Sequence, residues 1–168
     1  MEQALNEVKI QAKKILKGYK NKVPEQIVRL DKWHKTLNSI KSGVQLKHCQ
    51  VVIAKELGFR DWQHLHKVLS GEAVNNSDVN FGSLFYNKAC VSFVNQWFTT
   101  YGEAKVALDI EHYLLPFKRQ FLVVGANYIT MLGVTNGHKM LQVKHDLYAS
   151  YPSNEWDELV LQTLKHRQ

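Results

Sequence analysis

Apolar residues recur at helical spacing through the first 70 positions of the chain. Between about residues 3 and 19 they fall three or four apart, which predicts an amphipathic helix. Pro24 suits the first turn of a second helix, which is expected to run to about Gly43. A third helix is predicted over 46–57 and a short fourth one over 62–69, with Asp61 as its cap. The front of the chain is therefore expected to be a module of four helices.

The stretch from Ser70 to Ser83 has few apolar residues and many turn formers, so it is predicted to join two parts. This gives a helical module over 1–71, a linker over 72–82 and a second domain over 83–168. That second domain is expected to open with a long helix, because two apolar stripes run from Leu84 to Tyr101. Apolar and polar residues then alternate over 103–111, which predicts a half-buried strand.

Further along the chain, residues 120–124 are a second strand candidate. Two apolar segments, 128–135 and 138–143, flank Asn136-Gly137, which is a strong hairpin signal. Residues 129–132 also fit one helical turn, and both alternatives stay open. Ser153 is placed to cap a final helix. The predicted fold class is α+β, with an N-terminal all-α module followed by an antiparallel sheet of three or four strands packed by helices.

The positive charge is concentrated in the front of the chain. The formal net charge is +7, made up of +8 over residues 1–70 and −1 over residues 71–168. A charge asymmetry of this kind points to an acidic partner for the basic half.

Two sets of polar residues in the basic half are the candidate nucleic-acid-binding residues. They are Lys9, Lys13 and Lys17 on the first predicted helix, and Arg60, Gln63 and Lys67 on the fourth. The three lysines lie along one side of their helix and can follow a run of phosphates. If Trp62, Leu65 and Leu69 face inward, the second set shares the outward side of a helix that follows a short turn, as in DNA-binding helix-turn-helix proteins. A plain helical corner with a solvated surface is the alternative interpretation.

The remaining polar residues give no catalytic or metal-binding pattern. Asp109 and Glu111 share one side of a predicted strand, as a catalytic pair would, but a solvated strand explains them as well. Lys118 and Arg119 are suited to hold a phosphate or carboxylate. Cys49 lies at an apolar position, as does Cys90, and both are expected to be free buried thiols. We expect no metal, no cofactor and no catalytic residue.

One segment of the front half resembles a known family. The run Leu46-Lys-His-Cys-Gln-Val-Val-Ile-Ala-Lys-Glu-Leu-Gly-Phe-Arg-Asp-Trp-Gln-His-Leu65, with Gln11–Leu16 and Pro24-Glu25 upstream, is similar to a small helical module of bacterial proteins. This module occurs at the N-terminus of varied proteins, some of them labelled glyoxalase-related. The resemblance covers roughly residues 4–69 and implies a helical fold without a settled activity. Residues 84–168 resemble no family with comparable motifs.

Three functions are compatible with these patterns. The first is a non-catalytic binding protein whose basic module contacts an acidic partner, nucleic acid being the first candidate. The second is a protein–protein interaction or oligomerisation module that uses the aromatic back half. The third is a small enzyme of glyoxalase-like type. The sequence has no signal-peptide pattern and no long apolar run, so a cytoplasmic location without membrane contact is expected.

Overall fold

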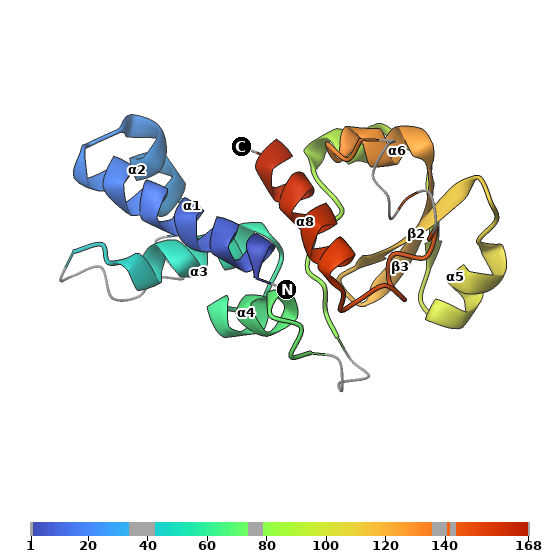
Figure 1. The fold of residues 1–168 in the computed structure, drawn as a ribbon. Helices are drawn as coiled ribbons and strands as arrows, with labels where there is room; N and C mark the ends of the chain where they lie inside the picture. The colour runs from blue at the N-terminus through green and yellow to red at the C-terminus, as the bar shows by residue number, and fades with distance from the viewer. Residues whose placement is uncertain (1, 34–42, 74–78, 136–140, 142–143, 168) are drawn as a thin grey trace.

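The computed structural model describes residues 2–33, 43–73, 79–135, 141 and 144–167. Its elements, in chain order, are α1 (Gln3–Lys20), α2 (Pro24–Asp31), α3 (Leu46–Glu56), α4 (Trp62–Leu69), the 3₁₀ helix η2 (Lys88–Ser92), β1 (Gln96–Phe98), α5 (Tyr101–Ala107), β2 (His112–Phe117), β3 (Gln120–Gly125), α6 (Ala126–Met131) and α8 (Asn154–His166) (Figure 1). The N-terminal half of the chain forms helices and the C-terminal half contributes an antiparallel sheet with further helices, so the fold is α+β, as predicted.

Local signals at the helix ends explain why the front helices were predictable. Pro24 stands at the start of α2, and Gly58 ends the α3 region with a φ of +76°. The amide of His64 donates to Asp61 Oδ1 at 2.7 Å, so Asp61 caps α4. The predicted continuation of the second helix through 34–42 lies outside the described residues.

The long helix predicted from Leu84 to Tyr101 is wrong. In its place the chain forms a turn, η2 and the strand β1. The side chain of Asn87 accepts hydrogen bonds from the amides of Ala89 and Cys90, at 2.9 and 3.2 Å, and so starts a new short helical turn. Because such side-chain bonds compete with a continuous helical ladder, the apolar stripe is interrupted. Val94 of this stripe is fully exposed.

The strand predicted over 103–111 is also wrong, because residues 101–107 form the helix α5. The Thr100 hydroxyl accepts from the Glu103 amide at 3.3 Å, and the Glu103 carboxylate accepts from the Thr100 amide at 3.2 Å. This reciprocal capping box begins a helix. Val106 and Ile110, which the alternating pattern placed inside, are exposed. A local capping motif therefore outweighed a short period-two pattern.

The sheet consists of three antiparallel strands in the order β1-β3-β2. The predicted strand over 120–124 is confirmed as β3, whereas β2 had not been predicted. Lys118 and Arg119 form the turn of the β2–β3 hairpin, and Lys118 has a φ of +52°. Pro116 fits β2 because this strand lies at an edge of the sheet.

Of the two alternatives for 128–135, the helical one is confirmed, since α6 covers residues 126–131. The hairpin expected at Asn136-Gly137 lies outside the described residues. The C-terminal helix is confirmed as α8, and the Trp156 amide donates to the Ser153 hydroxyl at 3.1 Å, as its predicted cap requires.

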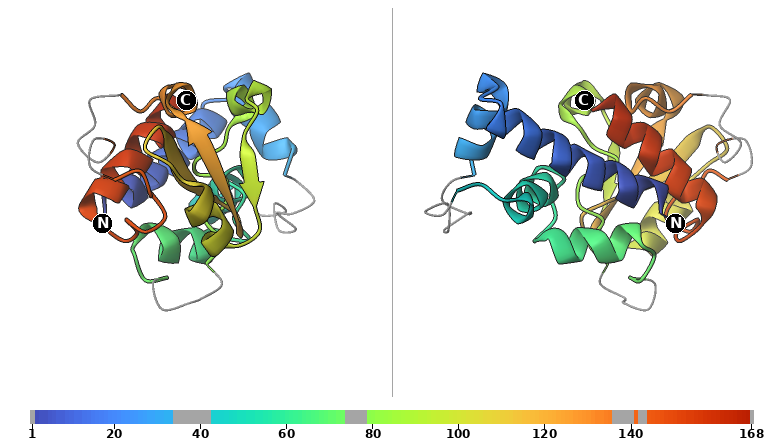
Figure 2. Two further views of the ribbon diagram at one scale, coloured as in Figure 1. Left: turned by 90° about the vertical axis from the view of Figure 1, so that its right-hand side faces the viewer. Right: turned by 60° about the vertical axis from the view of Figure 1, so that its left-hand side comes forward.

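The helix α8 lies between α1 and the sheet and packs against α1 (Figures 1 and 2). The carboxylate of Asp157, in the first turn of α8, accepts hydrogen bonds from the amides of Glu2, Gln3 and Ala4 at 2.9, 2.8 and 3.1 Å. No side chain near α1 caps it locally. The first helix of the chain is therefore capped by the last one.

One apolar core runs through both parts of the chain. It includes residues of α1, α3, α4 and α8 together with Leu115 and Leu122 of the sheet. The opposite face of the sheet carries Leu114 and Val123, which pack with Ala104 of α5 in a smaller cluster. The helical half and the sheet half thus meet along the larger core. That each half can fold alone remains a prediction.

Candidate anion-binding seam

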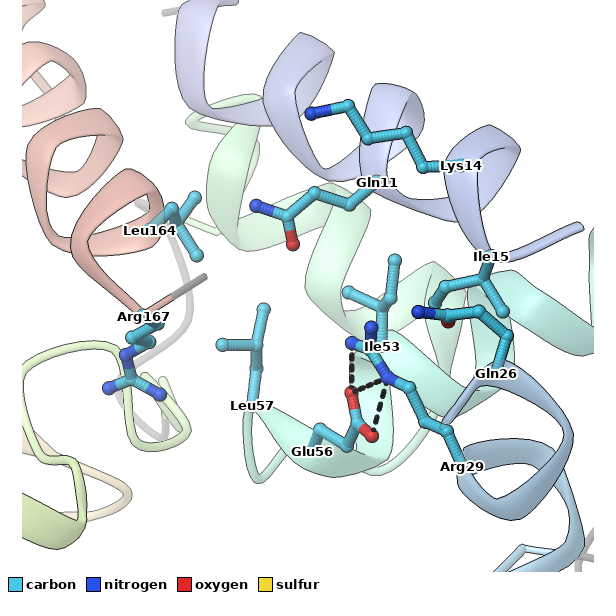
Figure 3. Close-up of a pocket in the computed structure, with 10 residues that line it drawn as sticks. All are labelled: Gln11, Lys14, Ile15, Gln26, Arg29, Ile53, Glu56, Leu57, Leu164 and Arg167. Atoms are coloured by element: carbon cyan, nitrogen blue, oxygen red, sulfur yellow. Dashed lines mark hydrogen bonds and ion pairs between the residues drawn. The ribbon is translucent and has the colours of Figure 1, made fainter. Parts of the chain in front are cut away.

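The helices α1 and α8 begin at neighbouring ends, and a hollow opens between them farther along (Figure 3). It measures about 510 Å³. We call it the helical hollow, and it is lined by Gln11, Lys14, Ile15, Gln26, Arg29, Ile53, Glu56, Leu57, Leu164 and Arg167. Asp157 holds α1 and α8 together at their N-terminal ends. The hollow lies where residues 11–15 of α1 face residues 164–167 at the end of α8.

A second hollow adjoins the first where the helical half meets the sheet half. It measures about 650 Å³, and we call it the sheet hollow. Its lining residues are Glu56, Gly58, Ser83, Tyr86, Asn87, Lys88, Ala89, Val91, Phe117, Lys118, Met131, His166 and Arg167. Because Glu56 and Arg167 line both hollows, the two form one seam between the halves.

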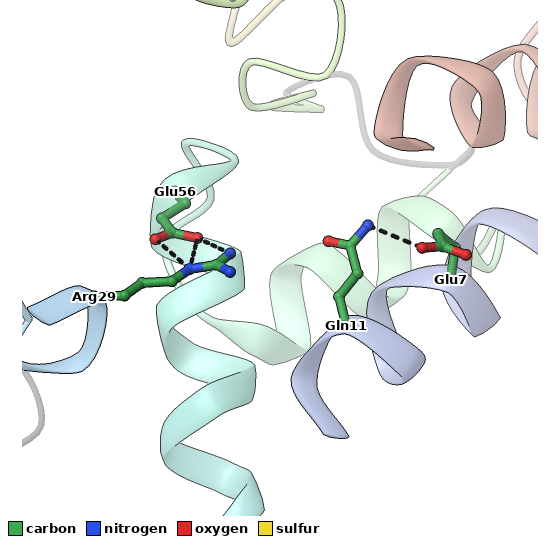
Figure 4. Close-up of polar contacts among 4 residues, drawn as sticks. All are labelled: Glu7, Gln11, Arg29 and Glu56. Carbon is green, nitrogen blue, oxygen red and sulfur yellow. Dashed lines mark hydrogen bonds and ion pairs between the residues drawn. The ribbon is translucent and has the colours of Figure 1, made fainter. Parts of the chain in front are cut away.

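An ion pair between Arg29 and Glu56 stands at the wall of the helical hollow (Figures 3 and 4). Arg29 Nη2 lies 2.6 Å from Glu56 Oε2, and Arg29 Nε donates to both carboxylate oxygens at 2.9 and 3.1 Å. Both side chains are about one third exposed, so water screens this attraction. On the opposite wall, Gln11 Nε2 donates to Glu7 Oε1 at 3.1 Å (Figure 4).

Arg167 stands where the two hollows meet, and its guanidinium turns toward the segment that precedes η2 (Figure 3). Its Nη2 donates to the carbonyl oxygens of Ser83, Leu84 and Tyr86, the last two at 2.9 and 2.8 Å. Burial lowers the pKa of this guanidinium. None of the described carboxylates forms an ion pair with it, and its Nε is buried without a hydrogen-bond partner.

Cations outnumber carboxylates along the seam. The described lysine and arginine residues that line it are Lys14, Arg29, Lys88, Lys118 and Arg167, and the described carboxylate that lines it is Glu56. Glu56 is already paired with Arg29. The exposed ammonium groups of Lys14, Lys88 and Lys118 form no ion pair with a described carboxylate. An excess of cations along one hollowed surface creates a positive potential, which attracts anions.

The residues predicted from the sequence lie elsewhere. Lys13 and Lys17 are exposed and Lys9 is half-buried, so this set follows the outer side of α1. Arg60, Gln63 and Lys67 are all exposed on the outward side of α4 or just before it, and Arg60 Nε forms an ion pair of 2.9 Å with Asp61. The buried residues of α4 are Leu65, Val68 and Leu69, whereas Trp62 is only half-buried. The structure thus groups the six residues in two sets, one on each helix, and none of them lines the seam.

Several seam residues were missed because they are far apart in the sequence. Lys14 follows the predicted Lys13 directly in the sequence, and it lines the helical hollow although Lys13 does not. Lys88 and Arg167 come from the half that has almost no net charge, so charge counted by halves hides them. Lys118 had been considered as a phosphate contact, and it does line the sheet hollow. Arg119, its neighbour in the hairpin turn, does not line it.

The acidic pair considered as a catalytic pair lies in the turn after α5. Asp109 Oδ1 accepts from the amides of Glu111 and His112 at 2.9 and 3.0 Å, and His112 Nδ1 lies 2.7 Å from it. The bond from His112 holds the pKa of Asp109 below its ordinary value. Glu111 is exposed, and the two carboxylates do not converge on a hollow. The local bonds of Asp109 fit a role in forming this turn.

Within the described part of the chain, no group of three or more His, Cys, Asp or Glu side chains is placed to hold a metal ion. Cys49 and Cys90 are buried and free. None of the helices in the described ranges is long and apolar enough to cross a membrane. The chain matches no protein-family model, no curated protein and no solved structure.

Proposed function

We propose that the protein is a non-catalytic binding protein for an acidic macromolecule, with nucleic acid as the first candidate, and that the seam holds its phosphates. The excess of cations over carboxylates along the seam carries this proposal. A cytoplasmic location and membership in the bacterial helical module family belong to the same proposal. The outer lysines of α1 are a competing site for the same partner.

Phosphate binding fits the seam better than binding of an uncharged ligand. Lys14, Lys88 and Lys118 are exposed cations at its rim, and they have no described carboxylate to neutralise them. Arg167 adds a half-buried charge where the hollows meet. Proteins that neutralise phosphates with lysine and arginine release condensed counterions, which makes such binding strong at low salt and weak at high salt.

Two triple variants of equal charge change separate the seam from the outer lysines. One replaces Lys14, Lys88 and Lys118 by Glu, and the other replaces Lys9, Lys13 and Lys17 by Glu. Affinity is measured by fluorescence anisotropy with a labelled oligonucleotide over a series of salt concentrations. The wild type is expected to bind at low salt. The seam variant should lose affinity, and its log–log salt slope should fall by about 2, at roughly 0.7 per phosphate on a single strand.

The outer-lysine variant controls for net charge. If it loses as much affinity as the seam variant, the long-range charge of the module explains the binding. If it loses more, the site is the outer side of α1. The absence of wild-type binding at low ionic strength would refute the nucleic-acid proposal altogether.

Protein–protein interaction is the second candidate, and exposed apolar side chains favour it. Val91 and Met131, which line the sheet hollow, are 67% and 38% exposed, and Val94 nearby in the chain is fully exposed. Clusters of exposed apolar residues mark interaction surfaces. Sedimentation velocity over a range of concentrations would support this candidate if it detected dimers, and a monomer at all concentrations would count against self-association.

A further inference from the structure

Three aromatic rings meet beside the sheet hollow. Tyr86 and Phe117 line this hollow, and their ring centroids lie 5.0 Å apart. Trp97 contacts both of them, with centroid distances of 5.9 Å to Tyr86 and 5.3 Å to Phe117. We call these residues the aromatic trio. Trp97 keeps 44% of its surface exposed, which is unusual for a large aromatic side chain in contact with two others.

The position of the trio follows from the register of the sheet. Trp97 pairs with Leu122, and Leu122 pairs with Leu115, so these three side chains share one face. Phe117, two residues after Leu115, lies on the same face. Leu115 and Leu122 on that face belong to the larger core, which also includes residues of the helices. Since β1 is an edge strand, the row of apolar side chains reaches solvent at Trp97, beside the seam.

Cations line the hollow that the trio borders. Lys118 Nζ lies 5.3 Å from the centroid of the Phe117 ring, and Lys88 and Arg167 line the hollow that Tyr86 and Phe117 border. Aromatic rings without nearby cations fit an apolar protein segment, and cations without rings fit any phosphate. Rings and cations side by side fit a ligand that has flat rings and phosphates at regular spacing. Single-stranded nucleic acid has this chemistry.

We infer that the seam selects unpaired nucleic acid, and that an unpaired base stacks on Trp97 while its neighbouring phosphates contact Lys88 and Lys118. This inference rests on the proposed function and names the class of nucleic acid. In a duplex both faces of each internal base are covered by neighbouring base pairs, so no internal base offers a face to Trp97. In a single strand a base can turn out and stack on an aromatic side chain.

The test uses the full chain and three labelled probes of equal length. These are a 12-nucleotide oligothymidylate, a 12-unit abasic phosphodiester strand and a 12-base-pair duplex. The wild type should bind oligothymidylate more tightly than either of the other probes. Stacking of one base on an aromatic ring corresponds to a change of roughly tenfold in affinity.

Three variants test the role of the ring. Trp97→Ala should weaken oligothymidylate binding roughly tenfold and leave the abasic strand almost unaffected, because only the base touches Trp97. Trp97→Phe keeps an aromatic face and should recover most of the lost affinity. Val94→Ala, which removes a fully exposed apolar side chain near Trp97 in sequence, is the matched control and should behave as the wild type. Thermal unfolding checks that each variant is folded.

The outcomes separate the two levels of the proposal. If the wild type binds none of the probes, both the proposed function and this inference fail. If it binds all three probes equally, or if Trp97→Ala weakens the abasic strand as much as oligothymidylate, phosphate binding stands and base stacking is wrong. If Trp97→Ala does not fold, Trp97→Phe decides: a loss of the preference for oligothymidylate over the abasic strand in that folded variant overturns the inference, and a retained preference supports it.

Discussion

Asp146 is a buried carboxylate that joins α5 to the turn over residues 146–149. Its Oδ2 accepts a hydrogen bond of 2.6 Å from the Tyr101 hydroxyl and one of 2.8 Å from Lys105 Nζ, and its Oδ1 accepts from the Ala149 amide at 2.9 Å. Burial alone would raise the pKa of Asp146, but the bonds from Lys105 and Tyr101 outweigh it and hold this pKa below its ordinary value of 3.8. Burial and the bond to Asp146 also raise the pKa of Tyr101 to about 12.

These shifts predict how the stability of the protein depends on pH. A carboxyl group whose pKa is lower in the folded state stabilises the fold above its unfolded pKa, and this stabilisation disappears as the pH falls through the folded pKa. The free energy of unfolding should therefore decrease as the pH is lowered through 3.8 and below. In Asp146→Asn part of this decrease should vanish, as measured by urea denaturation between about pH 5 and pH 2.

The control for this prediction is Asp31→Asn, because Asp31 is exposed at the end of α2. Its pH profile should match that of the wild type. Equal profiles for wild type and Asp146→Asn would show that the charge of Asp146 does not contribute to stability in this range.

Among the helices, α1 and α8 are joined by a shared apolar core and, at their N-terminal ends, by one side chain. Asp157 is 1% exposed and accepts from three backbone amides at the start of α1. The N-terminal ends of the two helices lie together, and each carries a partial positive charge from its backbone dipole. A carboxylate between these ends offsets that repulsion, in addition to accepting hydrogen bonds from amides that have no partner within the helix.

Replacing this carboxylate should therefore destabilise the fold far more than replacing an exposed one. Asp157→Asn is expected to lower the free energy of unfolding by about 2–4 kcal/mol, because asparagine is uncharged and its NH2 group cannot accept a hydrogen bond from these amides. Asp31→Asn should change it by no more than about 0.5 kcal/mol. Chemical denaturation followed by circular dichroism measures both, and similar values for the two variants would contradict the assigned role of Asp157.

The elements that the sequence predicted correctly are those with strong local signals. The helix α4 has Asp61 as its cap, and α8 has Ser153. Over 84–101 the local bonds of Asn87 and Thr100 decided the structure, although the apolar pattern favoured one helix. The strand β2 escaped prediction because Pro116 argues against a strand in the sequence, although a strand at the edge of a sheet accepts a proline. The link between Asp157 and α1 joins residues more than 150 positions apart, so no local pattern could have indicated it.

For the whole molecule, the shared core determines how the two halves behave after cleavage. Protease is expected to cut first between Ser70 and Ser83, because exposed backbone rich in turn formers is cut first. Because α8 packs on α1 and their apolar residues belong to one core, the two pieces should stay together under native conditions. Size-exclusion chromatography of the cleaved protein should give one peak that contains both pieces, and separation in urea confirms that the chain was cut.

Two results would contradict this view of the molecule. Separation of the pieces in native buffer would show that the halves are independent domains. First cuts within 46–69 or 84–101 would show that the predicted boundary is misplaced. The candidate site depends on the same arrangement, since Lys14 and Lys118 reach the seam only when both halves are joined. The sequence, examined half by half, could therefore not have indicated the seam.

The contact between Asp157 and the start of α1 has a consequence for how the chain is made. A ribosome releases α1 long before it has added residue 157, so the newly made helix has neither its cap nor the apolar surface of α8. The side of α1 that packs on α8 in the finished fold therefore has no partner during this interval. During synthesis the basic N-terminal half is therefore present before α8, which packs on it in the finished fold. Nascent chains stalled before residue 157 should bind chaperones that recognise apolar helices, and chains that have released α8 should not.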